Sequence, residues 1–271
     1  MTHSTAPRLV RLAAALALAA AAAPSLAQSE GGPTAAMDGA WHFTIAPYFW
    51  ASGISGTASV ANLPEVPVDL SFSDIFSDLD FGVLGYFEAR RDRFGVATDV
   101  VYVNLGPPVG TAAPVIGKLN LKADVRSTIA EAFLFYRVAS GGRRDNPATL
   151  DILAGTRYSD SRTRLTATTD AGIAYDGQFL DLDWWDALAG VKFTAPLGSR
   201  VSLLGRADVA GFGSKVTWNL EGELAYRASH HWAFGAGWRH LDIDYDEGEN
   251  LDRKVFKIAY DGPMAWLAYS W

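Results

Sequence analysis

The last ten residues of the chain alternate strictly between the two faces of an extended segment. One face carries Ala265, Leu267, Tyr269 and Trp271, and the other carries Met264, Trp266, Ala268 and Ser270. This period of two predicts a β-strand. At the edge of a soluble sheet the apolar row would lie in water, whereas a strand that closes a cylinder can turn it toward lipid. The alternative is a buried last strand of a soluble sandwich.

The first 27 residues have the pattern of an export signal. Arg8 and Arg11 precede an apolar run from Leu12 to Ala23, and Ser25 and Ala27 are small residues at the positions that a signal peptidase reads. The run is about twelve residues long, too short to cross a ~30 Å hydrocarbon core as a helix. We predict a cleaved signal peptide over residues 1–27, a short periplasmic segment over 28–40 and a barrel domain over 41–271. An uncleaved anchor is the alternative.

Composition excludes several classes of protein. After residue 27 there is no apolar run of about eighteen residues, so a helical membrane protein is excluded. The net charge is −7 and becomes about −9 without Arg8 and Arg11, which argues against a nucleic-acid partner. The chain has no cysteine, so an exported protein must fold without disulfides. Its 26 Gly, 9 Trp and 10 Tyr suit a barrel with tight turns and interfacial aromatic residues.

From Trp41 onward the sequence predicts paired strands. The clearest hairpin joins residues 81–90 to residues 94–103 through a tight turn at 91–93. The count is about ten strands, within a range of about eight to twelve, which is even as a single-chain barrel with both termini in the periplasm requires. A short helix capped by Ser73 is expected within the connection 61–80.

The predicted connections alternate in length. The short ones are 91–93, the turn after Val138, 196–200 and 228–231, and the long ones are 61–80, 106–120, 166–183 and 244–253; the short connection 213–215 is the exception. Short periplasmic turns opposite long outer loops are typical of outer-membrane barrels.

Several segments resemble a family of bacterial outer-membrane β-barrel proteins of a small-porin-like type, most of them uncharacterised. They are WHFTIAPYFW at 41–50, VDLSFSDIF at 68–76, LDFG at 79–82 and FEARR at 87–91. The terminal aromatic with Tyr269 two residues earlier is similar to the C-terminal signature of these barrels, although Trp271 stands where Phe is usual. The resemblance implies an outer-membrane location and a barrel fold, and it implies no reaction or substrate.

Charged residues within the predicted strands lie opposite the apolar rows. A Lys or Arg facing hydrocarbon near the midplane would cost ~2–4 kcal/mol, so we expect these side chains to face the lumen. They are Glu88, Arg90, Asp99, Arg157, Asp186, Lys192, Arg206, Asp208, Glu221, Glu223 and Arg239. They could form an ion-pair network that stiffens a narrow barrel, or they could line a thin polar channel.

Two further features concern the strand faces. In the strand 121–138, Asp124 and Arg126 have the opposite parity to Glu131 and Arg137, so either a bulge separates the two pairs or some of these residues lie beyond the lipid boundary. Aromatic residues near strand ends are predicted to form a membrane-interface girdle, namely Tyr48, Trp50, Trp185, Trp218, Trp232, Tyr269 and Trp271.

An enzyme is the competing function. His240, Asp242, Asp244 and Asp246 lie where a strand meets an outer loop, where an acid and a histidine could act as general bases on lipid or peptide. No motif pairs them with a nucleophile. The segment 242–248 resembles a calcium loop only superficially, since its Gly is one place late and Arg253 stands at the twelfth position.

The sequence therefore predicts an all-β, closed antiparallel transmembrane barrel in the outer membrane, non-enzymatic, porin-like or structural, with at most a narrow polar channel and neither cofactor nor metal. The expected partners are outer-membrane lipid, lipopolysaccharide and the barrel-assembly machinery, the last through the C-terminal strand. Binding of an external ligand or partner through segments 61–80 and 166–183 is a further alternative.

Overall fold

The computed structural model describes residues 39–60, 65–106, 110–112, 119–143, 146–169 and 172–271. The chain divides into two units, Met1–Glu30 and Gly31–Trp271, and the first lies wholly outside the described residues. The predicted signal peptide and residues 28–38 of the predicted N-terminal segment therefore lie outside them too.

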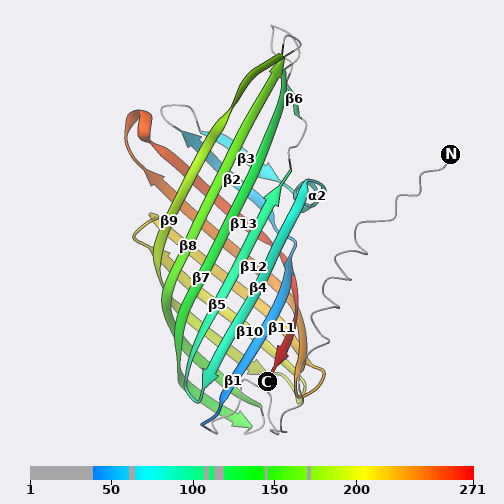
Figure 1. The fold of residues 1–271 in the computed structure, drawn as a ribbon. Coiled ribbons are helices and arrows are strands. Elements are labelled where there is room, and N and C mark those ends of the chain that lie inside the picture. Colours follow the sequence, from blue (N-terminus) through cyan, green and yellow to red (C-terminus); the bar gives the residue numbers. More distant parts are fainter. Residues whose placement is uncertain (1–38, 61–64, 107–109, 113–118, 144–145, 170–171) are drawn as a thin grey trace, which may run out of the picture. The chain divides into compact units, whose positions relative to one another are not determined.

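Antiparallel β-strands make up nearly all of the described chain (Figure 1). The strands are β1 (Trp41–Trp50), β2 (Gly53–Val60), β3 (Val66–Leu70), β4 (Leu79–Arg91), β5 (Phe94–Leu105), β6 (Gly110–Ala112), β7 (Leu119–Arg143), β8 (Asn146–Thr169), β9 (Gly172–Pro196), β10 (Val201–Gly211), β11 (Val216–Arg227), β12 (Trp232–Glu247) and β13 (Lys254–Ser270). One helical turn, α2 (Phe72–Ser77), and one 3-10 turn, η1 (Asn250–Asp252), interrupt them. Among the described residues, no helix has the length and apolar character to span a membrane.

The last strand closes the sheet. β13 pairs with β12 on one side and with β1 on the other, with Ser270 opposite Thr44 and Met264 opposite Trp50. Within the described residues this gives a ring of ten strands: β1, β4, β5, β7 and β8 to β13. The strand that begins with β1 is interrupted at Ala51 and Ser52, and β2 then pairs with the next part of β13. The predicted closed antiparallel barrel of about ten strands is confirmed.

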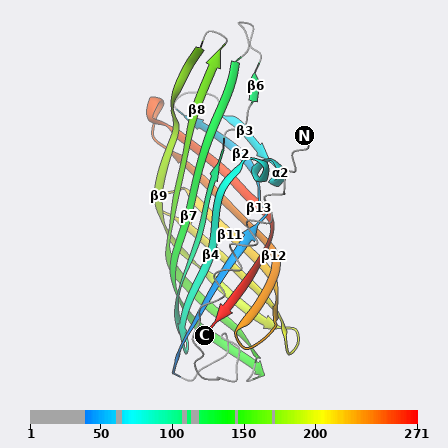
Figure 2. The same ribbon diagram turned by 45° about the vertical axis from the view of Figure 1, so that its right-hand side comes forward.

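Strands β7, β8 and β9 rise beyond the others at the end away from the C-terminus (Figures 1 and 2). They contain 25, 24 and 25 residues, and β8 and β9 stay paired as far as Thr169 and Gly172. The predicted eighteen-residue loop over 166–183 is therefore wrong. Paired strands that extend beyond the apolar layer need no alternation of apolar and polar residues, so the sequence pattern did not indicate strands here. The β-branched threonines within 163–169 were the one feature that favoured a strand.

Two smaller predictions are also corrected or resolved. Helix α2 is capped by Ser71, not Ser73: the Ser71 hydroxyl accepts from the Asp74 amide at 3.3 Å, and the Asp74 carboxylate accepts from the Ser71 amide at 3.0 Å. This reciprocal capping box fixes the start of the turn. On β7 there is no bulge between Arg126 and Glu131, because the register shift lies between Arg137 and Ala139; Asp124 and Arg126 are exposed on the extension.

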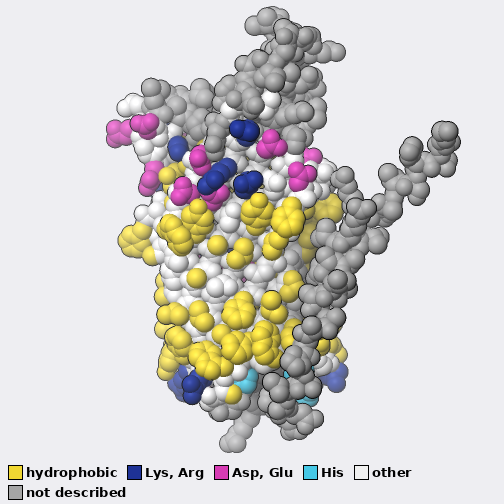
Figure 3. Space-filling view, viewed as in Figure 1, with side chains coloured by type: hydrophobic (Ala, Val, Ile, Leu, Met, Phe, Trp, Pro, Cys, Tyr) yellow, Lys and Arg dark blue, Asp and Glu magenta, His cyan; other side chains and the backbone are white. Residues whose placement is uncertain are grey.

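The outer wall carries an apolar belt (Figure 3) between charged residues at both ends. Its large exposed side chains include Ile45, Val83, Leu134, Ile152, Val191, Val209, Leu220, Leu224, Phe234 and Leu267. Exposed aromatic residues bound it, as at Trp218 and Tyr226 on β11. The eight residue steps between those two cover about 27 Å of strand, or about 21 Å of height at a tilt of about 40°, close to the ~25 Å apolar band of membrane barrels.

Five of the seven aromatic residues predicted for the interface lie on the outer wall or at its end, and two point into the lumen. Trp185, Trp218 and Trp271 are exposed, and Trp232 and Tyr269 are half-buried beside each other at the end where the chain terminates. For Tyr48 and Trp50 the prediction is wrong, since both point inward with Ala46. The Tyr48 hydroxyl donates to Asp99 at 2.7 Å and the Trp50 indole donates to the Gly262 carbonyl at 3.3 Å. These internal acceptors satisfy their polar atoms as well as water at an interface would.

A charge on the outer wall tests whether the belt faces lipid. We expect Leu224→Arg to lower the unfolding free energy in lipid vesicles by about 2 kcal/mol, because a cation would then face hydrocarbon. Denaturant titration followed by tryptophan fluorescence measures it. The control is Leu197→Arg, at an exposed apolar side chain in the turn 197–200, for which we expect almost no change. Equal small effects of both substitutions would contradict a lipid-facing belt.

Candidate functional site

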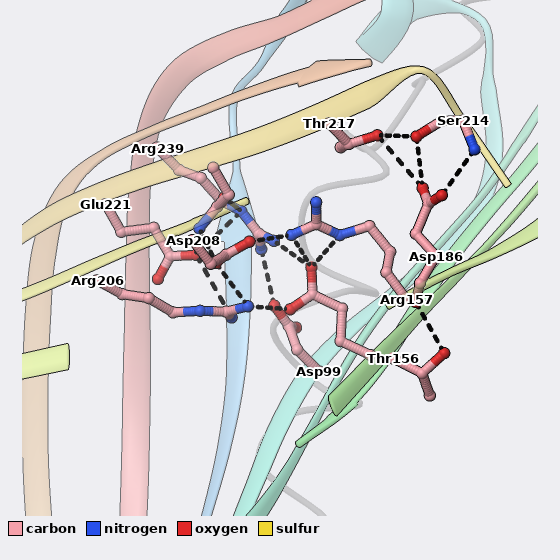
Figure 4. A network of polar contacts seen from close by, with 12 residues as sticks. Asp99, Thr156, Arg157, Asp186, Arg206, Asp208, Ser214, Thr217, Glu221 and Arg239 are labelled. Atoms are coloured by element: carbon pink, nitrogen blue, oxygen red, sulfur yellow. Dashed lines mark hydrogen bonds and ion pairs between the residues drawn. The ribbon is translucent and has the colours of Figure 1, made fainter. Parts of the chain in front are cut away.

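The lumen contains a buried network of ion pairs that includes Arg157, Arg206 and Arg239 (Figure 4). These three arginines meet at Glu131 of β7. Arg157 of β8 donates to the Glu131 carboxylate at 2.8 Å, and Arg206 of β10 donates to its other oxygen. Arg239 of β12 approaches it at 3.7 Å. One carboxylate thus receives three guanidinium groups from three strands.

Asp208 joins the same network from β10. It accepts from Arg157 at 2.6 Å, from Arg206 at 2.8 Å and from the side-chain amide of Asn219 at 3.1 Å. Asn219 turns its carbonyl oxygen toward Arg239, 3.0 Å away. A carboxylate offers about four lone-pair positions, so Asp208 is nearly saturated by donors.

Arg239 connects this centre to the opposite wall. It donates to Asp99 of β5 at 2.9 Å and to the hydroxyl of Tyr48 of β1 at 3.1 Å, and it pairs with Glu221 of β11 at 3.2 Å. The Arg239 side chain is 1% exposed. The network therefore spans the lumen from β11 and β12 to β1 and β5.

A second group of ion pairs lies nearer the end of the barrel with the turns 92–93 and 197–200, here called the short-turn end. Arg90 bridges Glu88 and Asp151, each at 3.1 Å, and Arg137 donates to Asp151 at 2.9 Å. Lys192 donates to Glu88 at 2.6 Å. All of these side chains are largely buried.

Two phenylalanine rings of β7 make cation–π contacts with the buried cations. Arg90 and Lys192 lie over the ring of Phe135 at 4.6 and 3.8 Å, and Arg206 lies over the ring of Phe133 at 4.6 Å. A cation over a ring gains about 0.5–2 kcal/mol depending on desolvation. The Phe135 ring occupies the space in front of Gly95 on β5, where any Cβ would overlap it. The glycine thus makes room for the ring that carries two cations.

Asp186 of β9 is buried and has no cationic partner among the described residues, and hydrogen bonds stabilise its carboxylate instead. It accepts from the amides of Gly213 and Ser214 at 2.9 and 2.7 Å, from the Ser214 hydroxyl at 2.8 Å and from the Trp184 indole at 3.1 Å (Figure 4 shows Ser214 and Thr217 beside it). The turn 212–215 is therefore fastened to the inside of the wall.

Beyond the ion network, away from the short-turn end, the lumen is filled by a buried apolar core. It consists of Trp50, Val101, Ile129, Leu180, Leu182, Trp184, Leu241, Ile243, Tyr245, Phe256, Ile258 and Met264. Trp184 packs on Tyr245 with ring centres 4.6 Å apart. Charges and hydrocarbon thus fill successive levels of the same lumen.

On the other side of the network, at the short-turn end, lies a cavity of about 270 Å³. Asp99, Arg206, Glu221 and Arg239 line its inner part, and Arg227, Ser229 and His230 line its mouth. Ser229 and His230 are exposed and Arg227 is half-buried, so the cavity opens at the short-turn end and ends at the ion network.

Ten of the eleven charged residues predicted for the lumen take part in these internal contacts, although the sequence does not show how they pair; the eleventh, Glu223, lines the cavity. The prediction missed Glu131, Arg137 and Asp151 as lumen residues. Glu131 and Arg137 share the parity of Phe133 and Phe135 and oppose the exposed Leu134 and Tyr136. Asp151 shares a face with Arg157. Parity within each strand was therefore a usable signal, and the contrary parity of Asp124 and Arg126 obscured it on β7.

The residues considered for hydrolysis do not meet in a pocket. The ring of His240 stacks on Trp218 at 4.5 Å and its Nδ1 lies 2.9 Å from Asp261, on the outer wall. Asp246 instead pairs with Lys215 and Arg253, both at 3.0 Å. In the described part of the chain, no group of three or more His, Asp or Glu side chains is arranged to hold a metal ion.

Asp246 lies past the apolar belt and joins two loops. Arg253 follows η1 and Lys215 belongs to the turn 212–215, so one carboxylate ties both segments to the end of β12. Hydrogen bonds and the charges of Arg253 and Lys215 hold the pKa of the Asp246 carboxyl well below its usual range. The clamp therefore persists to acid pH.

No known protein-family model matches the chain, and no curated protein matches its sequence. Solved structures with a similar fold include the outer-membrane protease OmpT of Escherichia coli, at 9% identity and a TM-score of 0.49 over 87% of this chain and 98% of that one. The translocator domain of the autotransporter NalP of Neisseria meningitidis aligns at 12% identity and a TM-score of 0.40, over 87% and 90%. OprG of Pseudomonas aeruginosa aligns at 12% and 0.35, over 90% and 99%. Likenesses this distant carry no conclusion about activity.

Removing one buried cation tests the network. We expect Arg157→Met to lower the unfolding free energy by about 3–5 kcal/mol, because Glu131 and Asp208 would each lose a fully buried partner. Arg162→Met is the control: Arg162 is 48% exposed and pairs with Asp160 at 2.9 Å, and such a pair contributes about 1 kcal/mol or less. Equal losses for the two variants, measured by denaturant titration, would contradict the central role of the network.

The Asp246 clamp predicts a pH dependence. Because its pKa is lower in the folded protein than in the unfolded chain, the clamp contributes stability above the unfolded value of about 3.9 and loses it as the pH falls through the folded pKa. At pH 7 we expect Asp246→Asn to speed amide hydrogen exchange at 212–215 and 250–253, and we expect this difference to shrink in strong acid. A difference that grows below pH 4 would show that the assigned sign is wrong.

Proposed function

We propose that this protein is a small, non-enzymatic outer-membrane β-barrel with a structural role, whose lumen is closed to solutes. The observation that carries the proposal is the filling of the lumen at two successive levels, by the ion network around Glu131 and by the apolar core around Trp184. A porin needs a continuous polar path. Here a solute entering from the short-turn end would have to separate buried ion pairs and then cross hydrocarbon side chains.

The outer wall supports the location. A closed ring of strands leaves no unpaired edge along the barrel, and the exposed apolar belt matches the thickness of a membrane barrel. Outer-membrane lipid would contact this belt, and lipopolysaccharide would contact its outer border. We expect the barrel-assembly machinery to recognise the C-terminal strand and the exposed Trp271 that follows it. With the short-turn end toward the periplasm, both ends of the barrel domain face the periplasm.

An enzymatic role finds less support. His240 has its acid partner in Asp261 on the outer wall, and Asp246 is held between two cations. Among the described residues, His240 forms no hydrogen bond with a serine, threonine or lysine side chain. We therefore expect no hydrolysis of lipid or peptide. His240→Ala should leave the ion network and the cavity of the lumen unchanged.

Conductance separates a closed barrel from a pore. We expect the refolded protein, inserted into a planar lipid bilayer, to give no stepwise current above that of the protein-free membrane, because buried ion pairs and apolar side chains occupy the conduction path. Insertion is verified by heat-modifiable gel mobility and by protection of the belt from protease in vesicles. Reproducible current steps from verified insertions would contradict the proposal and restore the narrow-channel hypothesis.

A further inference from the structure

Glu223 of β11 differs from the other carboxylates of the lumen. Among the described residues, Glu88, Asp99, Glu131, Asp151, Asp208 and Glu221 each pair with at least one Arg or Lys side chain. Asp186 has no cation but accepts several hydrogen bonds from the turn 212–215 and its neighbours. Among the described residues, Glu223 has one hydrogen-bond partner, the indole N–H of Trp266, and no ion-pair partner.

The position of Glu223 gives it access to a ligand. It lines the cavity of about 270 Å³ that opens at the short-turn end, together with Leu204, Ala225, Trp266 and Ala268. Gly237 on the adjacent strand leaves the space that the Glu223 side chain fills. The carboxylate therefore lies beside apolar side chains, between the charged inner part of the cavity and its polar mouth, with three of its about four acceptor positions open.

A carboxylate in such surroundings favours a cation that brings its own donors. Transfer of a charged group away from bulk water is costly unless it is paired and hydrogen-bonded, and an ammonium group supplies both charge and three N–H donors. The apolar walls and the flat face of an indole suit a hydrocarbon or aromatic body. The cavity volume lies just below the range of about 300–1,000 Å³ that is usual for small-ligand pockets, so the ligand must be small.

We propose that the short-turn cavity binds a small organic cation, an amine whose ammonium group is held by Glu223 and whose hydrocarbon part packs against Trp266 and Leu204. The ligand enters past Ser229 and His230 and stops at the ion network. This site is independent of whether the lumen conducts, since it requires only the mouth at the short-turn end.

The test uses the full mature chain refolded in detergent, in phosphate buffer because Tris is itself an amine. The probe is 2-phenylethylamine, with 2-phenylethanol as the neutral isostere and 3-phenylpropionate as the anionic one. Binding is followed by calorimetry and by the indole N–H resonance of Trp266, identified from Trp266→Phe. We expect the amine to shift that resonance and to bind at least about tenfold more tightly than either isostere, as loss of a charge-assisted hydrogen bond implies.

Two variants and one control complete the design. Glu223→Gln should weaken amine binding by roughly ten- to a hundredfold and leave 2-phenylethanol unaffected. Ala225→Trp keeps the carboxylate but fills the cavity, and should abolish binding of the amine. Glu249→Gln, at an exposed residue before η1, should change nothing. Absence of amine binding at millimolar concentration, equal binding of amine and alcohol, or undiminished binding in folded Glu223→Gln or Ala225→Trp would each overturn the proposal.

Discussion

The structure depends on the pairing of its first and last strands. Between Thr44 and Trp50, β1 takes up one edge of β13, and the sheet then has no free edge around its ring. Only such closure permits an exposed apolar wall, because backbone donors and acceptors that face hydrocarbon have no water to bind. The alternation at the C-terminus is thus a requirement of closure: Ala268 and Ser270 must face inward if Leu267 and Trp271 are to face outward.

Closure also determines what the inside must contain. Ten strands enclose a narrow lumen, and side chains that point inward have to pack against one another. Unpaired charges there would be strongly unfavourable, and most of the buried charges share partners: Glu131 pairs with three arginines, and Arg239 pairs with acids on β5 and β11. Shared partners make the network cooperative, so its members are better regarded as one unit than as separate salt bridges.

The fold was largely predictable from the sequence. Most of the charged residues that face the lumen were predictable too, but the contacts between them were not. Strict alternation on β4, β5 and β13 determined the faces, since a slip of one residue would exchange them. The same logic failed where a strand left the apolar layer, as at 166–183, because polar residues may then occupy both faces. It failed again at Tyr48 and Trp50, whose amphipathic rings suit an interface and a lumen equally. Which acid meets which base depends on register and on distances across the lumen. Arg157 and Asp208, which lie 51 positions apart, carry no sequence sign of their contact.

Gly95 shows how closely the wall and its contents are connected. It lies on β5, yet the space above it belongs to the Phe135 ring of β7, on which Arg90 and Lys192 rest. A methyl group added to the sheet at this point would displace an aromatic surface and, with it, two positive charges near Glu88. Engineering of the interior electrostatics of this barrel therefore has to begin with the backbone of its wall, where a single missing side chain sets the height at which those cations sit.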